Sequence, residues 1–210
     1  MPDYDQQRGA ARENLCRYLA ACYYQPGPEY AEEKVFESML DAAVRVDPAL
    51  AACARRLGGA FADEGVDNLL VDYTRLFLGP AHIIAKPYGS AWLEGEQTLM
   101  QDSTAEVDAL YAEGGFEIDE GFRELPDHIA AELEFLYLLI FRENEAHRSD
   151  DRAALAALAD LRKRFLGGHL GSWTGPFTAA IRDGAESVFY RELAELTGRF
   201  VSMEAAPPPG

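Results

Sequence analysis

Apolar residues recur along most of the chain at intervals of three and four positions, the spacing that places them on one face of an α-helix. Runs in which apolar and polar residues alternate, as they do in half-buried strands, are lacking. The pattern therefore predicts an all-α fold. No repeat and no break in composition divides the chain, so we expect one helical bundle domain of about nine or ten helices over residues 1–203, followed by a disordered tail over residues 204–210.

Capping and turn residues mark the ends of the expected helices. Pro26-Gly27-Pro28 ends the first, and Asp47-Pro48 supplies a cap and a first-turn proline for the third. Two prolines and a glycine interrupt residues 79–88, which we interpret as an ordered connector that crosses the domain. The expected helices cover approximately residues 8–24, 29–46, a third from 48, a fourth around 66–77, 103–114, 126–141, 151–166 and 186–203.

Composition and charge narrow the possible partners. Hydrophobic residues make up 48% and aromatic residues 11% of the chain, which is enough for a packed core. The net charge is −17, opposite in sign to that of proteins that bind nucleic acid or anionic membranes. Residues 102–151 hold 15 acidic residues against three arginines. This segment indicates either a basic partner or a well-solvated surface.

The cysteines and the N-terminus indicate a location in the cytoplasm. Cys16, Cys22 and Cys53 form no Cys-x-x-Cys pair, which favours buried thiols in a reducing compartment. The first residues lack a basic start followed by an apolar run, and no stretch approaches the ~18 apolar residues of a membrane span. We therefore expect no stable membrane insertion.

The most informative stretch is residues 124–141. At about 100° per residue, His128, Glu132 and Phe135 fall within one sector of a helix. In a structural interpretation, Pro126 starts the helix, Asp127 favours its positive N-terminal end and His128 pairs with Glu132. In a functional interpretation, Asp127 and Glu132 meet a cationic ligand while the apolar stripe beyond them meets a hydrophobic one. The residues alone leave both interpretations open.

The same stretch resembles the signature helix of a known family. Leu125-Pro126-Asp127-His128 followed by residues 132–136 is similar to the signature of the TorD/DmsD/NarJ family of redox-enzyme maturation chaperones. Residues 72–80, 87–94 and 165–177 resemble further segments of that family, in the same order. The resemblance spans about residues 8–200.

The resemblance implies an all-α chaperone and not an enzyme. Such proteins bind the twin-arginine signal peptide, or the N-terminal segment, of the catalytic subunit of a molybdopterin oxidoreductase, delay its export and assist insertion of its cofactor. Pro126, Asp127 and His128 match the signature, whereas Leu125 stands between Glu124 and the proline, where the family often has the acid directly before it. The expected signal-peptide-binding residues are Asp127, His128, Pro126, Glu132, Glu124, Tyr88, Trp92 and Phe135.

Two other classes of function compete with this one. An enzyme would need a site that the sequence does not complete: His128 and Glu132 lack further metal ligands, and neither a Gly-x-Ser-x-Gly elbow nor a phosphate-binding loop is present. We expect no metal and no resident cofactor, although transient association with the molybdopterin cofactor or a guanine nucleotide stays open. A helical adaptor, the second rival, would bind a folded oxidoreductase subunit independently of any leader. The sequence names no client and no oligomeric state.

Overall fold

A computed structural model describes residues 5–79, 82–94, 102–119 and 121–206. Over these residues the chain is helical, with a single isolated bridge between Tyr88 and His128 in place of any strand. The all-α prediction is confirmed. The elements are α1 (Gln6–Ala21), α2 (Glu29–Glu32), α3 (Val35–Val46), α4 (Pro48–Tyr73), the π-helical turn η1 (Thr74–Leu78), α5 (Ser90–Leu93), α6 (Asp102–Gly114), α7 (Ile129–Arg148), α8 (Arg152–Gly168), α9 (Leu170–Gly184) and α10 (Val188–Ala205).

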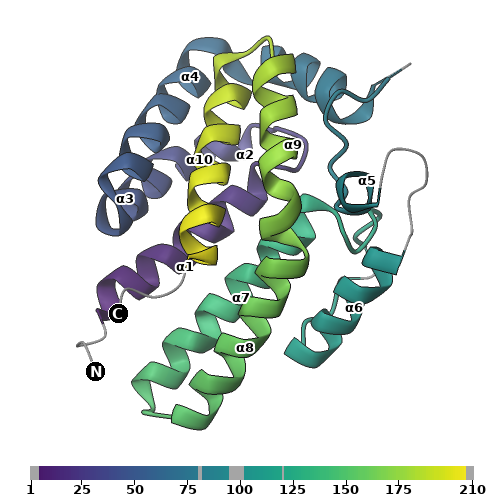
Figure 1. Cartoon of the computed structure of the whole chain (residues 1–210). Helices are drawn as coiled ribbons and strands as arrows, with labels where there is room; N and C mark the ends of the chain where they lie inside the picture. Colours follow the sequence, from purple (N-terminus) through teal and green to yellow (C-terminus); the bar gives the residue numbers. More distant parts are fainter. Residues whose placement is uncertain (1–4, 80–81, 95–101, 120, 207–210) are drawn as a thin grey trace.

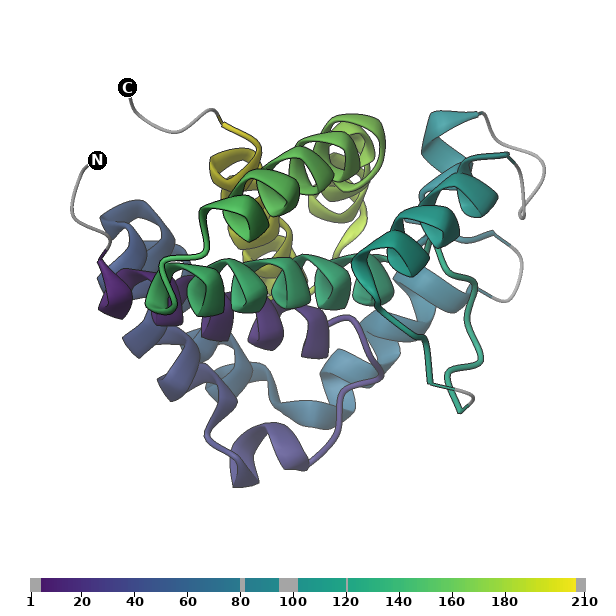
Figure 2. The same ribbon diagram turned by 90° about the horizontal axis from the view of Figure 1, so that it is seen from below.

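The longer helices pack against one another in one bundle. Helix α4 lies against α3 and α10, and α9 runs beside α10 (Figure 1). Helix α1 lies along α7, as the view from below shows (Figure 2), and α8 returns antiparallel to α7. Helices α5 and α6 lie at the edge of the bundle, next to α9 and α8 respectively. The start of α7 is therefore reached by the connector from one side and by α6 from another.

Apolar side chains that follow the helical spacing form one continuous core. Leu15 and Leu19 of α1, the helix that packs against α7, are fully buried, as are Trp173 and Phe177 of α9. Burial of each such side chain stabilises the fold by about 1.5–3 kcal/mol. All three cysteines are free and buried, as expected for core thiols. No helix among the described residues is long and apolar enough to cross a membrane.

The division into helices differs from the prediction at Lys34, whose positive φ of 53° splits the predicted helix 29–46 into α2 and α3. The predicted boundary between the third and fourth helices is present inside α4, as a kink at Gly65, whose φ of 73° and ψ of 160° are non-helical and suit glycine and few other residues. At Lys34 a single backbone conformation decides the boundary, and helical periodicity does not encode it.

Asp72, in the family-like segment 72–80, anchors the start of α10. Its buried carboxylate accepts hydrogen bonds from the Ser187 amide at 2.9 Å and from the Ser187 hydroxyl at 2.7 Å. It also accepts one from the Arg75 guanidinium at 2.7 Å. Although burial opposes ionisation, these donors lower the pKa of Asp72 below its ordinary value. This segment therefore joins the end of α4 to the loop before α10.

The C-terminal helix is longer than the sequence predicts. Helix α10 continues to Ala205, so residues 204 and 205 are not part of a disordered tail, and residues 207–210 lie outside the described residues. The physical reason is Glu204, whose buried carboxylate pairs with Arg12 of α1 at 2.7 Å and Arg162 of α8 at 3.2 Å. Glu143 of α7 joins the same two arginines. This ion-pair cluster connects four helices.

Candidate functional site

The connector and the start of α7 are held together by backbone hydrogen bonds. The Gly89 amide donates to the Asp127 carbonyl, and the Ile129 amide donates to the Pro87 carbonyl, each at 2.8 Å. This bridge keeps His128 extended, with a ψ of 139°, so α7 begins at Ile129 and not at Pro126 as predicted. Pro126 and Asp127 therefore precede the helix.

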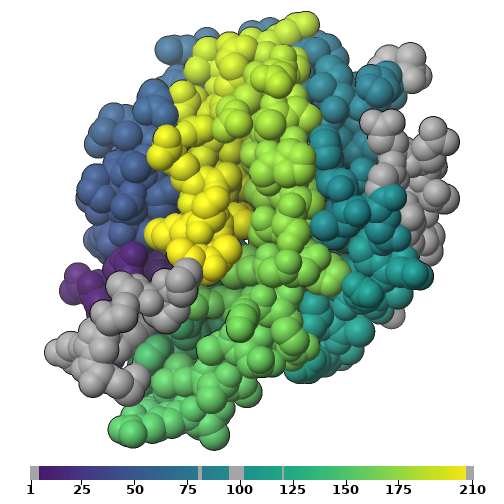
Figure 3. Space-filling view, viewed as in Figure 1, coloured from purple at the N-terminus to yellow at the C-terminus, as the bar shows by residue number. Residues whose placement is uncertain are grey.

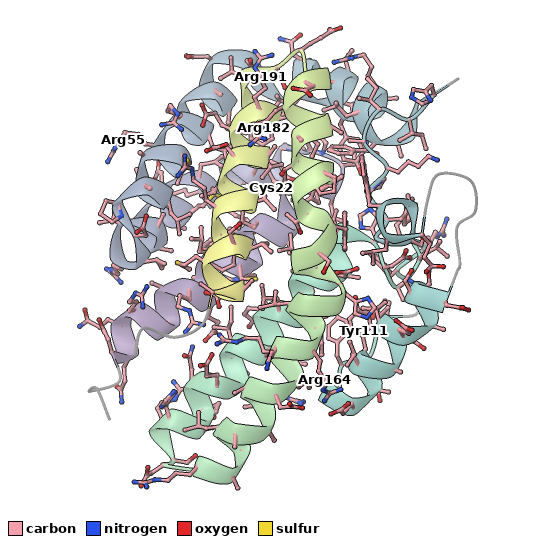
Figure 4. All side chains as sticks on the ribbon, in the orientation of Figure 1. Cys22, Arg55, Tyr111, Arg164, Arg182 and Arg191 are labelled. Carbon is pink, nitrogen blue, oxygen red and sulfur yellow. The ribbon has the colours of Figure 1, made fainter. Side chains whose placement is uncertain are left out.

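Asp127 is buried beneath the connector. Its exposed fraction is 1%, and one carboxylate oxygen accepts a hydrogen bond from the Ser90 amide at 2.8 Å. The other oxygen, Oδ1, has no hydrogen-bond partner among the described residues. From the opposite side the Tyr111 hydroxyl of α6, labelled in Figure 4, donates to the Pro126 carbonyl at 2.8 Å. The loop 126–127 is thus fixed by α5 and by α6.

His128 caps α7 and is neutral at pH 7. Its Nδ1 accepts a hydrogen bond from the Ala130 amide at 3.2 Å, which satisfies one of the free donors of the first turn. Burial lowers the pKa of His128 to about 4, although Glu124 and Asp127 act in the opposite direction. Its ring meets the Tyr88 ring edge-on, with centroids 5.4 Å apart. His128 is therefore a structural cap that also forms part of an aromatic contact.

Glu132 is fully buried in the core. Both of its oxygens accept from the Trp173 indole nitrogen of α9 at 3.1 Å, and the predicted pairing with His128 is not formed. Burial raises the pKa of Glu132 well above its ordinary value; the Trp173 hydrogen bond opposes the rise and the nearby Asp127 adds to it. A Cβ atom at Gly89 would lie 2.9 Å from the Trp173 indole nitrogen and 3.0 Å from Glu132 Oε1, so a larger residue here would displace this buried pair.

The predicted aromatic residues lie in two environments. Phe135 is fully buried between helices, in ring contact with Tyr111 of α6 at 4.8 Å and Phe165 of α8 at 4.9 Å. Trp92 and Tyr88 are half-buried; the Trp92 indole donates to the Lys86 carbonyl at 2.8 Å. Phe135 therefore supports the position of α6, whereas Tyr88 and Trp92 reach the surface.

Four rings form a row over the start of α7; three of them are at least partly exposed and the fourth, that of His128, is buried. The row, which we call the aromatic row, consists of Tyr24, Phe122, His128 and Tyr88, with successive centroids 6.3, 6.0 and 5.4 Å apart. A carboxylate lies at each end. The Tyr24 hydroxyl donates to Glu134 at 2.6 Å, and the Tyr88 hydroxyl donates to the exposed Glu124.

Three members of this surface, Tyr24, Phe122 and Glu134, were not predicted. They come from the segment after α1, the loop before α7 and α7 itself, so no spacing within one helix relates them. The signals in the sequence are that Phe122 and Glu134 belong to the acidic segment 102–151, and that Glu134 lies within the signature residues 132–136. Of the predicted residues, Tyr88, His128 and Glu124 meet here, while Asp127 and Glu132 lie beneath.

A pocket of about 410 Å³ opens at the Tyr24 end of the aromatic row. Its walls combine aromatic side chains with three carboxylates, those of Glu117, Asp119 and Glu134. A larger hollow of about 640 Å³ lies between α9 and α10, on the face seen in Figure 3, and contains none of the predicted site residues. Within the described residues no three His, Cys, Asp or Glu side chains are grouped as metal ligands.

The fold and this surface define a helical protein that presents acidic and aromatic side chains together. A sequence model of the family described as nitrate reductase delta subunit matches residues 43–179. The chain belongs to this family, that of the TorD/DmsD/NarJ redox-enzyme maturation chaperones. Its members are chaperones, which supports the expectation that the chain is not an enzyme.

Individual relatives agree with the family assignment. The chaperone protein TorD of Vibrio parahaemolyticus is 33% identical over 141 residues, which are 66% of this chain and 63% of that relative. The Tat proofreading chaperone DmsD of Salmonella typhimurium is 25% identical over 181 residues, covering 86% of this chain and 82% of the relative. A crystal structure of a candidate redox enzyme maturation protein from Archaeoglobus fulgidus shares the fold, with a TM-score of 0.54 and 21% identity over 91% of this chain and 93% of that one.

Proposed function

We propose that this chaperone binds the twin-arginine signal peptide, or the N-terminal segment, of the catalytic subunit of a molybdopterin oxidoreductase. In this proposal it acts in the cytoplasm, holds back export and assists cofactor insertion until the client is mature. The names of the relatives, chaperone protein TorD and Tat proofreading chaperone DmsD, support this class of partner.

The aromatic row with a carboxylate at each end is the observation that carries the proposal. A twin-arginine leader has two guanidinium groups followed by a hydrophobic stretch. Carboxylates accept hydrogen bonds from guanidinium groups, and aromatic faces attract the same cations and bury apolar side chains. Both halves of such a peptide therefore find matching chemistry on one surface.

The predicted site residues take two roles in this proposal. Tyr88, Glu124, Pro126 and Trp92 are at least partly exposed and contact the leader. The buried residues Asp127, His128, Glu132 and Phe135 position these contacts, because they fix the connector, the first turn of α7 and helix α6.

The overall charge assists the encounter. A chain of net charge −17, with its acidic residues concentrated between 102 and 151, attracts a basic leader over distances of about a Debye length. The association rate should therefore fall as the salt concentration rises, while apolar burial keeps the complex together once formed.

Calorimetric titration with synthetic leaders of molybdoenzymes from the same genome tests the proposal. Each leader is compared with a copy in which both arginines are alanine, and with the catalytic subunit lacking its leader. We expect one leader to bind well above the others and to lose affinity when the arginines are replaced. If no leader bound while the leaderless catalytic subunit did bind, the proposal would be rejected in favour of a helical adaptor for a folded oxidoreductase subunit.

A further inference from the structure

A pocket lies at the Tyr24 end of the aromatic row, and Tyr88, at the other end, does not line it. Tyr24 is 36% exposed and projects beyond the end of α1, where its ring meets Phe122 edge-on at 6.3 Å. Its hydroxyl donates to Glu134 at 2.6 Å, and both side chains line the pocket of about 410 Å³. Ala131, one turn before Glu134 on α7, lines it as well.

The hydrogen bond from Tyr24 orients the Glu134 carboxylate without saturating it. Only Oε1 is engaged by Tyr24, and a carboxylate has about four acceptor positions on its two oxygens. Partial burial, followed by the bond to Glu134, raises the pKa of Tyr24, so the phenol stays neutral and a donor at physiological pH. The pocket thus holds a carboxylate with acceptor capacity left for a ligand.

The chemistry of a paired-arginine leader calls for two separate receptors. In an extended peptide, successive side chains point to opposite sides, so two adjacent arginines cannot enter one pocket together. The aromatic row carries one tyrosine–carboxylate pair at each end, Tyr24 with Glu134 and Tyr88 with Glu124. One pair is therefore available for each arginine side chain.

We propose that the pocket of Tyr24, Phe122 and Glu134 is a receptor for one arginine of the leader, and that Tyr88 and Glu124 receive the other. This inference rests on the proposed function. The guanidinium bonds Glu134 and lies against the Phe122 and Tyr24 rings, while Glu117 and Asp119 add negative potential at the same pocket. Arginine fits better than lysine because its planar group can bond a carboxylate and stack on a ring at once.

A double-mutant cycle tests the assignment. Glu134→Gln removes the charge and keeps the shape, Tyr24→Phe keeps the ring and removes the donor, and Glu37→Gln on α3 is an exposed control with the same change of charge. Each variant is titrated with the cognate leader and with leaders in which the first or the second arginine is lysine or alanine. Circular dichroism verifies that each variant remains helical.

The expected results differ for the two arginines. Glu134→Gln should reduce the affinity for the unmodified leader about tenfold, the effect expected for loss of a hydrogen bond to a charged group. When the arginine that enters this pocket is already alanine, Glu134→Gln should reduce the affinity no further. When the other arginine is alanine, Glu134→Gln should still reduce the affinity about tenfold. Tyr24→Phe should weaken binding less, and Glu37→Gln should leave it unchanged.

The outcomes separate the two proposals. If the wild-type chain binds no leader, the proposed function itself fails. If the wild-type chain binds a leader but Glu134→Gln behaves as Glu37→Gln does, the function stands and the arginine pocket is wrong. Equal coupling of Glu134 to both arginines would also overturn the one-receptor-per-arginine assignment.

Discussion

His128 makes the stability of the fold sensitive to acid. Its pKa is lowered to about 4 by burial, below its ordinary value of 6.5. Between these two values the unfolded chain binds a proton more readily than the folded one, so the free energy of unfolding is highest above pH 6.5 and decreases as the pH falls toward 4. Compared with His128→Asn, which keeps a capping side chain and does not titrate, the wild-type chain should lose about 3 kcal/mol of unfolding free energy between pH 7 and pH 4. Urea unfolding at several pH values measures this, and parallel curves for the two proteins would contradict it.

The effect of Glu132 on stability changes with pH in the opposite direction. Its pKa is raised by burial, so its burial costs no free energy below the ordinary carboxyl pKa and costs progressively more as the pH rises. Glu132→Gln should therefore stabilise the chain at pH 7 by about 1 kcal/mol or more, with little difference at pH 4. Thermal unfolding at both pH values tests this. A destabilised variant at pH 7 would mean that the ionised carboxylate is required by Trp173.

The signature stretch could be recognised in the sequence, but not which of its residues reach the surface. Angular spacing placed His128, Glu132 and Phe135 in one sector of a helix, but His128 is extended and precedes α7, and Glu132 contacts Trp173 in place of His128. Glu132 is buried against Gly89 and Trp173, which approach from distant parts of the chain. Such long-range contacts leave no periodic signal within the helix itself.

At the scale of elements, the Glu204 ion-pair cluster holds α10 against α1 and α8. Glu204 is 5% exposed, and Glu204→Gln should lower the unfolding free energy by about 2–4 kcal/mol, because Arg12 and Arg162 lose a buried partner. Glu195→Gln on the same helix also breaks two ion pairs, those with Arg182 and Arg199, but these arginines are about half exposed. The control should cost at most about 1 kcal/mol. Equal losses in urea unfolding would show that the cluster adds no special stability.

Helix boundaries were predictable where a local cap sets them. Asp47 caps α4 as its sequence position indicates, and Asp151 caps α8. The start of α7 was predicted three residues too early because the bridge between Tyr88 and His128 overrides the helical preference of Pro126. The break at Lys34 has no comparable local signal, since lysine seldom adopts a positive φ.

At the scale of the whole molecule, periodicity was sufficient for the fold class, and composition gives the sign of the charge that a partner should carry under the proposed function. Helical spacing is local, and the charge of −17 is a sum over the chain, so neither needs tertiary structure. The aromatic row could not be predicted without the tertiary structure, because Tyr24, Tyr88 and Phe122 come from three separate connecting segments. The sequence therefore indicated the signature but not the surface that it supports.

Photo-crosslinking tests most directly where the leader binds. A cognate leader carrying a photoreactive phenylalanine analogue beside its arginine pair is irradiated with the wild-type chain, and the attached residues are identified by mass spectrometry. We expect attachment at Tyr24, at Tyr88 and within residues 116–119 and 121–124, competed by excess unlabelled leader. Attachment instead to the hollow between α9 and α10, at residues such as Thr174 or Ser202, would contradict the account.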